Sequence, residues 1–333
     1  MSNESNPVLV SILLAARNEE ANIERCLRSL EALKFPKENI EICIGDDDSS
    51  DDTARIILNY IADKPYFKYH KVSDQILGLK GKANVLAQLA DLTKGKYLFF
   101  CDADIAVPTD WIEKMLGHFD VDTGVVVGLT RMKKTGFLSD FLSLEWLFTL
   151  SLMRYFALLN IPVSGLGNNM AVTRKAYDAV GGYQGIGFSI VEDYALFMAI
   201  AKKKFGFVQA YTKDVIAISE PLLSFRELVI QRKRWMQGIM QSPLAIRLCL
   251  IFSALLIPGI TLIAIWDPLR SIRMVVSNYF FITGIVLIAV LILRQWDLLK
   301  TVLLFWFYLI GISCLMLIVH LIPGKTLWKD RIY

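Results

Sequence analysis

Pairs of acidic residues follow apolar runs at two places in this chain. Asp46 and Asp47 follow one such run, and Asp102 and Asp104 follow the run Tyr97–Cys101. Two carboxylates one residue apart at the end of a buried strand can bind a hard cation, because Mg²⁺ typically takes one or two protein carboxylates together with phosphates and water. We therefore expect Asp104 to contact a metal ion, Mg²⁺ or Mn²⁺, and Asp102 to reach the metal or a bound nucleotide.

The first acidic cluster is dense, with five carboxylates in the seven residues 46–52. Ser50 or Asp51 can cap a following helix, but capping explains only one or two of these acids. An acid at a strand end can also accept hydrogen bonds from a nucleobase or a ribose. We expect Asp47 to bind a nucleoside in this way, with Asp46 as the weaker candidate.

Two lysines, Lys80 and Lys82, lie in a glycine-bearing segment, Gly78–Asn84, before an expected helix. Such a loop can approach phosphate closely, and the helix N-terminus adds a favourable dipole. The segment does not match the Walker pattern GxxxxGK[ST], so it is not a P-loop. It is either a loop that binds the phosphates of a nucleotide or a flexible basic turn.

Glu192 and Asp193 open another expected helix, after the glycine-rich stretch 181–187. Acids in the first turn of a helix are stabilised by the helix dipole, which is sufficient to explain them structurally. A carboxylate can also act as a general base that takes the proton of an attacking hydroxyl group. In that interpretation Asp193 is the base and Glu192 is a supporting acid.

A basic and aromatic motif, Gln231-Arg232-Lys233-Arg234-Trp235, lies just before a long apolar region. Arg234 could neutralise a departing diphosphate, and Trp235 offers a flat face to a sugar ring. Basic and aromatic side chains beside an apolar segment also anchor proteins at membrane surfaces, which is the alternative interpretation.

Alternating strands and helices must position these residues. The apolar runs predict strands, and the residues between them show helical spacing, which together predict an α/β fold with a mostly parallel, Rossmann-like sheet and flanking helices. Ligands of such sheets bind at the carboxyl ends of the strands, so both acidic clusters should meet in one cleft. The expected strands are Val8–Ala15, Ile40–Gly45, Phe67–Val72, Tyr97–Cys101 and Gly124–Thr130, and the expected helices are 23–33, 53–61, 81–92 and 111–119.

The chain changes character near Pro243, which divides it into an expected catalytic domain, 1–242, and an expected membrane domain, 243–333. Three apolar segments follow, and each reaches the roughly 20 residues that a helix needs to cross a bilayer. Burial in a large soluble core is the alternative. Helices near 138–159 and 222–242 are expected to lie at the membrane interface, although a core helix explains the first equally well. The expected spans are 244–266, 274–293 and 301–322.

The 333 residues carry a net charge of only +4, and the excess of basic residues lies after Pro243. No basic stripe is interleaved with aromatic residues, which argues against a nucleic-acid partner. The five cysteines are scattered, which argues against a zinc site or a disulfide framework and indicates a reducing compartment.

The N-terminus lacks a signal-peptide pattern, so the catalytic domain is expected in the cytoplasm. Three spans would then place Lys325, Lys329 and Arg331 outside, against the positive-inside tendency, and the number of true spans stays open.

Taken in order, these motifs resemble those of family 2 glycosyltransferases with a GT-A fold, over about Val8–Gly238. Ala16-Arg17-Asn18-Glu19-Glu20 and Asp47–Asp51 look like its nucleotide-contacting segments, Asp102 and Asp104 like its Asp-x-Asp, Val191–Asp193 like its Thr-Glu-Asp, and Gln231, Arg234 and Trp235 like its Gln-x-x-Arg-Trp. The sequence departs from the pattern at Arg17, at Val191 in place of Thr, and at Asp48 in place of Gly. The full set of expected nucleotide-sugar contacts is Ala16, Arg17, Glu19, Asp46, Asp47, Lys80, Lys82 and Asp102, and the expected catalytic residues are Asp193, Glu192, Arg234, Trp235 and Gln231.

The resemblance implies inverting, metal-dependent transfer of a sugar from a nucleotide-diphosphate sugar, expected to be a UDP-sugar. The acceptor is expected to be a lipid or a saccharide presented at the membrane during cell-envelope synthesis, and the protein is expected to be integral to the inner or plasma membrane. The tail has fewer helices than most polymer-exporting synthases use, which favours a lipid acceptor over a processive polysaccharide synthase. A membrane transporter and a non-catalytic nucleotide-binding scaffold are remote alternatives, because the apolar segments hold few ionisable residues and the expected catalytic residues are all present.

Overall fold

The computed structural model describes residues 8–189, 191–222, 224–239, 244–321, 327–328 and 331–332, and it describes their side chains except within 234–254 and from 320 onward. The chain divides into two compact units. The first unit comprises Met1–Lys133 and Leu152–Glu220, and the second comprises Lys134–Ser151 and Pro221–Tyr333. The division of the chain at residues 242 and 243 into a catalytic and a membrane domain stays a prediction.

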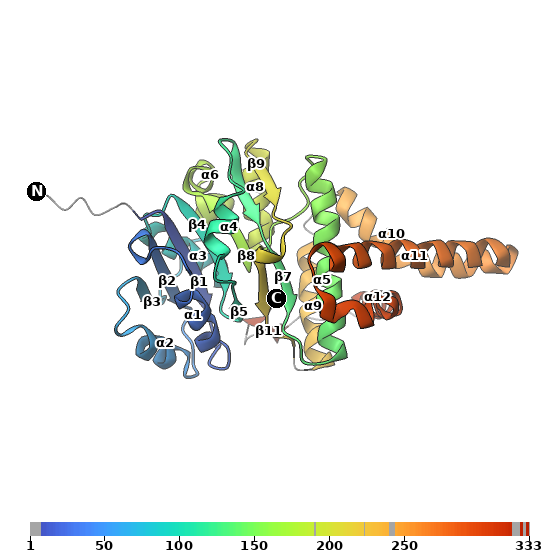
Figure 1. Cartoon of the computed structure of the whole chain (residues 1–333), viewed down its shortest axis with the longest axis horizontal. Helices are drawn as coiled ribbons and strands as arrows, with labels where there is room; N and C mark the ends of the chain where they lie inside the picture. Colours follow the sequence, from blue (N-terminus) through green and yellow to red (C-terminus); the bar gives the residue numbers. More distant parts are fainter. Residues whose placement is uncertain are drawn as a thin grey trace, which may run out of the picture. The chain divides into compact units, whose positions relative to one another are not determined.

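The first unit is built on a seven-stranded sheet (Figure 1). Four neighbouring strands are parallel, and β8 then runs antiparallel to both β4 and β6 before the parallel pair of β6 and β9. The predicted α/β fold with a mostly parallel sheet is therefore confirmed. In sheet order the strands are β3 (Phe67–Lys71), β2 (Ile40–Asp46), β1 (Val10–Ala16), β4 (Tyr97–Asp102), β8 (Asn169–Thr173), β6 (Thr123–Val127) and β9 (Gly206–Gln209).

The central strands are continuous apolar runs because helices cover both faces of a parallel sheet. Every residue of β2 is buried, and so are all but one of β1. Helix α1 (Ile23–Glu31) buries Ile23, Cys26, Leu27 and Leu30, the spacing of one helical face. Helices α2 (Thr53–Ile61) and α3 (Gly81–Leu92) begin and end where the sequence pattern predicts. Helix α4 (Trp111–Leu116) is shorter than the predicted segment 111–119.

The prediction of one strand over Gly124–Thr130 is wrong, because this segment contains parts of two strands that belong to different sheets. β6 ends at Val127, and β7 (Leu129–Met132) joins a three-stranded sheet with β5 (Ile105–Ala106) and β10 (Ile216–Ser219). Asn169 causes the change of direction, because its side-chain amide donates to the carbonyl oxygens of Leu129 and Val215. A Cβ at Gly128 would lie 2.2 Å from the Asn169 side chain, so only glycine fits at this crossing.

Three further helices belong to the first unit, and a fourth lies partly in each unit. α6 (Arg174–Ala179), α7 (Gly182–Ile186) and α8 (Glu192–Lys202) follow β8, while α5 (Phe137–Leu158) passes from the second unit into the first. The order of elements places β5 directly after Asp104, so the short sheet continues from the carboxyl end of β4. The predicted acidic site therefore lies where the two sheets of this unit meet.

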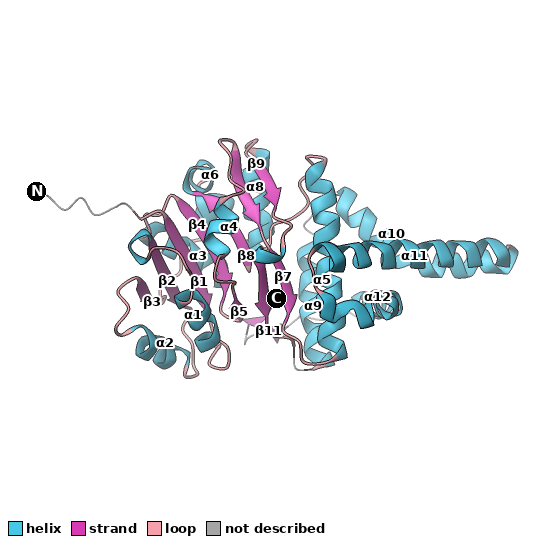
Figure 2. Ribbon diagram, viewed as in Figure 1, coloured by secondary structure: helices cyan, strands magenta, loops and turns pink. Residues whose placement is uncertain are grey.

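The described residues of the second unit are almost entirely helical (Figure 2). It contains α9 (Phe225–Ile239), α10 (Leu244–Trp266), α11 (Pro268–Ile292) and α12 (Leu299–Leu321), followed by the short antiparallel pair β11 (Leu327–Trp328) and β12 (Arg331–Ile332). α11 begins at Pro268, earlier than the predicted span at Met274. Asp267 caps it by accepting the backbone N–H of Arg270 at 2.9 Å, and proline is favoured in the first turn of a helix.

Three described helices are long and apolar enough to cross a membrane: Phe137–Leu158, Pro268–Ile292 and Trp296–Val319. The described part of α10, Leu255–Trp266, is a shorter apolar helix. Helix α5, which was predicted to lie at the membrane interface, is thus also long and apolar enough to cross a membrane. Its Glu145 accepts hydrogen bonds from Arg232 and Tyr308, and three of its leucines are fully buried, as expected of a packed helix.

Candidate active site

The loops that follow β1 and β2 are joined by hydrogen bonds at the carboxyl edge of the sheet. The backbone N–H of Asn18 donates to Ser49 Oγ at 3.1 Å, and that of Glu19 donates to Thr53 Oγ1 at 2.8 Å. In return, the Asn18 side chain accepts the backbone N–H of Ser50 at 2.9 Å. The two segments expected to contact a nucleotide therefore form one surface, because the parallel strands before them end side by side.

The predicted nucleoside contacts differ in how accessible they are. Asp47 is partly exposed, and its backbone N–H donates to the carbonyl oxygen of Ala16 at 2.9 Å. Arg17 donates to the carbonyl oxygen of Asp47. Asp46, in contrast, is only 1% exposed, and its carboxylate accepts hydrogen bonds from Ser49 and from the Tyr69 hydroxyl. Asp46 thus holds the turn together, and we retain Asp47 as the acid that faces a ligand.

Asp48 explains one departure from the family pattern, which has glycine at this position. Its φ angle of 54° lies in the left-handed region, where glycine is unstrained and aspartate is tolerated better than most residues. Asp48 therefore adopts a backbone conformation that glycine would also tolerate.

A lysine joins three elements of the first unit. Lys82, at the start of α3, places its Nζ 2.5 Å from Asp102 Oδ1 at the end of β4 and 3.2 Å from Glu192 Oε1 at the start of α8. Lys80, by comparison, is exposed. The sequence predicted Lys82 and Asp102 as separate ligand contacts, and the structure shows them as an ion pair. Burial alone would lower the pKa of Lys82, but Asp102, Glu192 and Asp193 raise it above its ordinary value.

Asp193 lies in the same cluster and is held by backbone groups. Its Oδ2 accepts the N–H of Gly167 at 2.5 Å, and its Oδ1 accepts the N–H of Tyr194 at 2.7 Å. Burial, and then the neighbouring Glu192, raise its pKa to about 6, while Lys82 and the two N–H groups act in the opposite direction. At neutral pH this carboxyl is therefore ionised and has a pKa close to the pH, which suits a general base.

The raised pKa of Asp193 predicts how the rate depends on pH. If the ionised form is active, kcat/KM falls as the pH drops through about 6. In a Lys82→Met variant the acid limb should move to higher pH, because the cation that lowers the pKa of Asp193 is gone. A pH–rate profile of both proteins measures the shift. A limb that stays in place, or moves to lower pH, would contradict the assignment.

Gly167 limits the space beside Asp193. A Cβ at this position would lie 2.9 Å from the Cβ of Asp193 and 3.3 Å from the Nζ of Lys82. We expect Gly167→Ala to displace the carboxylate and to lower kcat by roughly 10²-fold, the usual cost of misplacing a reacting group by about 1 Å. Gly136→Ala is the matched control, since a Cβ there meets nothing within 4 Å. Equal activities of the two variants would show that the position of Asp193 does not matter.

Asp104, two residues after Asp102, contacts side chains that the sequence analysis did not single out as site residues. Its carboxylate accepts the Ser219 hydroxyl at 3.0 Å, and its carbonyl oxygen accepts from the Arg25 guanidinium. Arg25 also pairs with Glu220 at 2.9 Å, and Lys133 pairs with the same carboxylate oxygen at 2.9 Å. These four residues come from α1 and from the ends of β7 and β10. No motif could reveal them, because only the short sheet brings them together.

The arrangement fits a divalent cation that a substrate helps to hold. Among the described residues there is no group of three or more His, Cys, Asp or Glu side chains able to bind a metal by themselves. Asp102 and Asp104 nevertheless supply two carboxylates at one strand end, and Mg²⁺ commonly uses such a pair together with phosphate oxygens and water. The ion pair of Asp102 with Lys82 is formed by its Oδ1 atom.

The Gln-x-x-Arg-Trp residues belong to the second unit. Gln231 lies on α9, and the side chains of Arg234 and Trp235 lie outside the described residues. Arg232, the residue after Gln231, donates to Glu145 Oε2 at 2.7 Å, and this contact joins α9 to α5. The catalytic roles of Gln231, Arg234 and Trp235 stay predictions.

Comparisons with known proteins place these residues in a family context. The family described as Glycosyl transferase family 2 matches residues 11–194. A beta-monoglucosyldiacylglycerol synthase of Trichormus variabilis is 29% identical over 235 residues, which make up 69% of this chain and 48% of that protein. A poly-beta-1,6-N-acetyl-D-glucosamine synthase of Staphylococcus aureus is 33% identical over 140 residues, 41% of this chain and 32% of that protein.

One solved structure shows the same fold over most of the chain. It is a mannosyltransferase from Pyrobaculum calidifontis in complex with GDP-Man and Mn²⁺, with a TM-score of 0.53 at 16% identity, and the match covers 86% of this chain and 87% of that one. The chain spans about half the length of the beta-monoglucosyldiacylglycerol synthases that it matches.

Proposed function

The chain belongs to glycosyl transferase family 2, and we propose that this glycosyltransferase transfers one sugar, with inversion, from a nucleotide-diphosphate sugar to a lipid acceptor at a membrane. The observation that carries the proposal is the carboxylate of Asp193, which two backbone N–H groups hold in place. Gly167 orients it, and its pKa is raised to about 6. A carboxylate of this kind can accept a proton from a hydroxyl at the moment of attack.

In the proposed reaction Asp193 accepts the proton of the acceptor hydroxyl while the hydroxyl oxygen attacks the anomeric carbon. The new C–O bond forms on the face opposite to the diphosphate, so the configuration at this carbon inverts. The bond from the anomeric carbon to the diphosphate breaks, and its electron pair leaves with the nucleoside diphosphate. Glu192 and Lys82 keep the charge around Asp193 balanced during this proton transfer.

The donor is proposed to lie along the strand-end edge of the first unit. Ala16, Arg17, Glu19 and Asp47 would contact the nucleoside, and Lys80 and Lys82 would face the diphosphate. Asp104 and Asp102 would hold Mg²⁺ or Mn²⁺, which supplies positive charge to the departing diphosphate. A UDP-sugar is proposed as the donor on the resemblance of the motifs. On the same resemblance, Arg234 is proposed to neutralise the departing diphosphate and Trp235 to face a sugar ring.

A lipid acceptor at the inner or plasma membrane is supported by two observations. The relatives that match 69% of this chain include beta-monoglucosyldiacylglycerol synthases, whereas the polysaccharide synthase matches 41%. In addition, three described helices are long and apolar enough to cross a membrane. The first unit is proposed to lie in the cytoplasm, where nucleotide sugars are made.

The test uses the full chain purified in detergent. Nucleotide sugars are supplied one at a time with Mg²⁺ or Mn²⁺, and a membrane lipid extract is the acceptor. Release of nucleoside diphosphate together with label in one discrete lipid band is the expected result. A ladder or a product of high mass would show a processive polysaccharide synthase instead. Absence of metal-dependent release with every donor would contradict the proposal.

A further inference from the structure

A groove of about 820 Å³ runs along one face of α11 in the second unit. Its α11 residues recur at helical spacing, so they lie on the same side of that helix. Leu256 and Ile260, one turn apart on α10, form the opposite wall. The α11 wall includes Asp267, Arg270, Arg273, Met274, Asn278 and Phe281.

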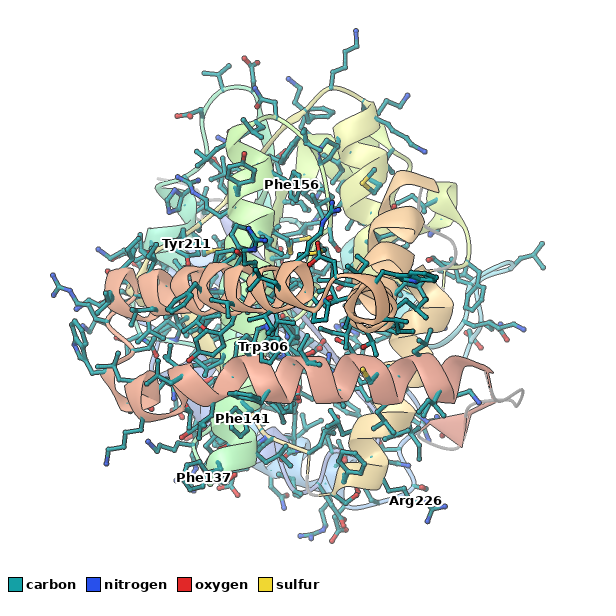
Figure 3. The ribbon with its side chains drawn as sticks, turned by 90° about the vertical axis from the view of Figure 1, so that its right-hand side faces the viewer. Phe137, Phe141, Phe156, Tyr211, Arg226 and Trp306 are labelled. Carbon is teal, nitrogen blue, oxygen red and sulfur yellow. The ribbon has the colours of Figure 1, made fainter. Side chains whose placement is uncertain are left out.

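The helices around this groove are fixed to one another by polar contacts. Ser271 donates its hydroxyl to the carbonyl oxygen of Ile260 at 2.9 Å, which joins α11 to α10. Trp306 of α12 is labelled in Figure 3. It donates its indole N–H to Asn278 at 2.8 Å, and this bond joins α12 to α11. The contact of Ser271 with Ile260 therefore joins the two helices that line the groove.

One end of the groove is cationic. Arg270 and Arg273 are exposed and lie about one helical turn apart. Within the described part of the chain, neither guanidinium pairs with a carboxylate. Asp267 lines the same end, but its Oδ1 already accepts the backbone N–H of Arg270 as the cap of α11. The Nε of Arg273 donates to the carbonyl oxygen of Leu269 at 3.4 Å. The other donors of the two guanidiniums are left to bind an anion, and guanidiniums favour phosphate because of their planar, branched donor geometry.

Apart from Ser277 and Asn278, the rest of the groove is apolar. Leu256, Ile260, Met274 and Phe281 supply its walls, and Phe281 is 65% exposed. Arg270 and Phe281 are separated by about 16 Å along the helix axis, at about 1.5 Å per residue. A ligand that fills the groove must therefore carry an anionic group at one end and a long apolar chain at the other.

We propose that this groove binds an anionic phospholipid. The phosphate lies between Arg270 and Arg273, and an acyl chain runs along Leu256, Ile260 and Phe281. A free phosphate would leave the apolar wall without a partner, and a neutral lipid would leave the two guanidiniums unpaired. Basic pockets between membrane helices bind anionic headgroups by the same physical principle. This lipid is bound and is not glycosylated, so the inference is independent of the proposed function.

The test measures binding to the full chain purified in neutral detergent. A fluorescent phosphatidylglycerol is titrated, and its anisotropy reports binding, with unlabelled phosphatidylglycerol, phosphatidylcholine and inorganic phosphate as competitors. We expect saturable binding that phosphatidylglycerol displaces. Arg270→Ala/Arg273→Ala should weaken binding about 10-fold or more, because each basic residue near an anionic headgroup contributes on the order of 1 kcal/mol. Arg270→Lys/Arg273→Lys should restore most of it.

Two variants separate the site from general effects. Lys300→Ala removes an exposed charge outside the groove and should bind like the natural protein. Ser277→Trp fills the groove without changing its charge, should also weaken binding, and carries the test if the double alanine variant does not fold. Equal displacement by phosphatidylcholine, complete displacement by inorganic phosphate, or unchanged binding in the double alanine variant would each overturn the proposal.

Discussion

Replacing Asp193 by Asn is expected to lower sugar transfer by about 10²- to 10⁴-fold, the usual contribution of a positioned general base. The amide has nearly the shape of the carboxylate, and its oxygen can still accept the N–H of Gly167, while its NH2 group replaces the oxygen that accepts the N–H of Tyr194. It cannot take up the proton of an attacking hydroxyl. The donor should still bind, because the strand-end loops and the Asp102–Asp104 segment are unchanged. Transfer is measured with a labelled donor, and donor binding by calorimetry.

The control for Asp193→Asn removes the same charge elsewhere in the first unit. Asp178 is exposed on α6, so Asp178→Asn should keep full activity. If Asp193→Asn transferred sugar as fast as this control, the assignment of the base would be wrong. Loss of both transfer and donor binding would instead show that Asp193 mainly maintains the structure of the site.

Replacing Asp104 by Asn should reduce activity by about 10³-fold, because a bound metal contributes several kcal/mol of charge stabilisation and each 1.4 kcal/mol is tenfold in rate. An amide oxygen is a weaker ligand for Mg²⁺ or Mn²⁺ than a carboxylate. It can still accept the Ser219 hydroxyl, so the loop should keep its shape. Binding of Mn²⁺ in the presence of a nucleoside diphosphate, followed by electron paramagnetic resonance, should weaken in parallel with activity.

Asp110→Asn is the matched control for Asp104→Asn. Asp110 lies a few residues further along the chain and pairs with Lys34 at 3.2 Å on a largely exposed surface. Its replacement should change neither Mn²⁺ binding nor transfer. Normal metal stimulation in Asp104→Asn would exclude Asp104 as the principal metal ligand.

The sequence by itself determined the local elements and their order. Apolar runs of strand length gave β1, β2 and β4, and helical spacing gave α2 and α3 at their observed ends. These elements are set by interactions between residues close in the chain, which a linear pattern contains. Parallel strands end at one edge, and the segments after β1 and β2 are joined there by hydrogen bonds. The meeting of Asp46 and Asp47 with Asp102 and Asp104 in one cleft stays a prediction.

The pairing of side chains within the site was decided by the tertiary structure. The sequence did not show that Lys82 would lie between Asp102 and Glu192, that Gly167 would hold Asp193, or that Asp46 would face inward. It also did not show that β7 would leave the main sheet and bring Lys133 to Glu220. The physical reason is that the pairing, burial and pKa of these groups depend on contacts between distant segments, which exist only after both sheets have formed.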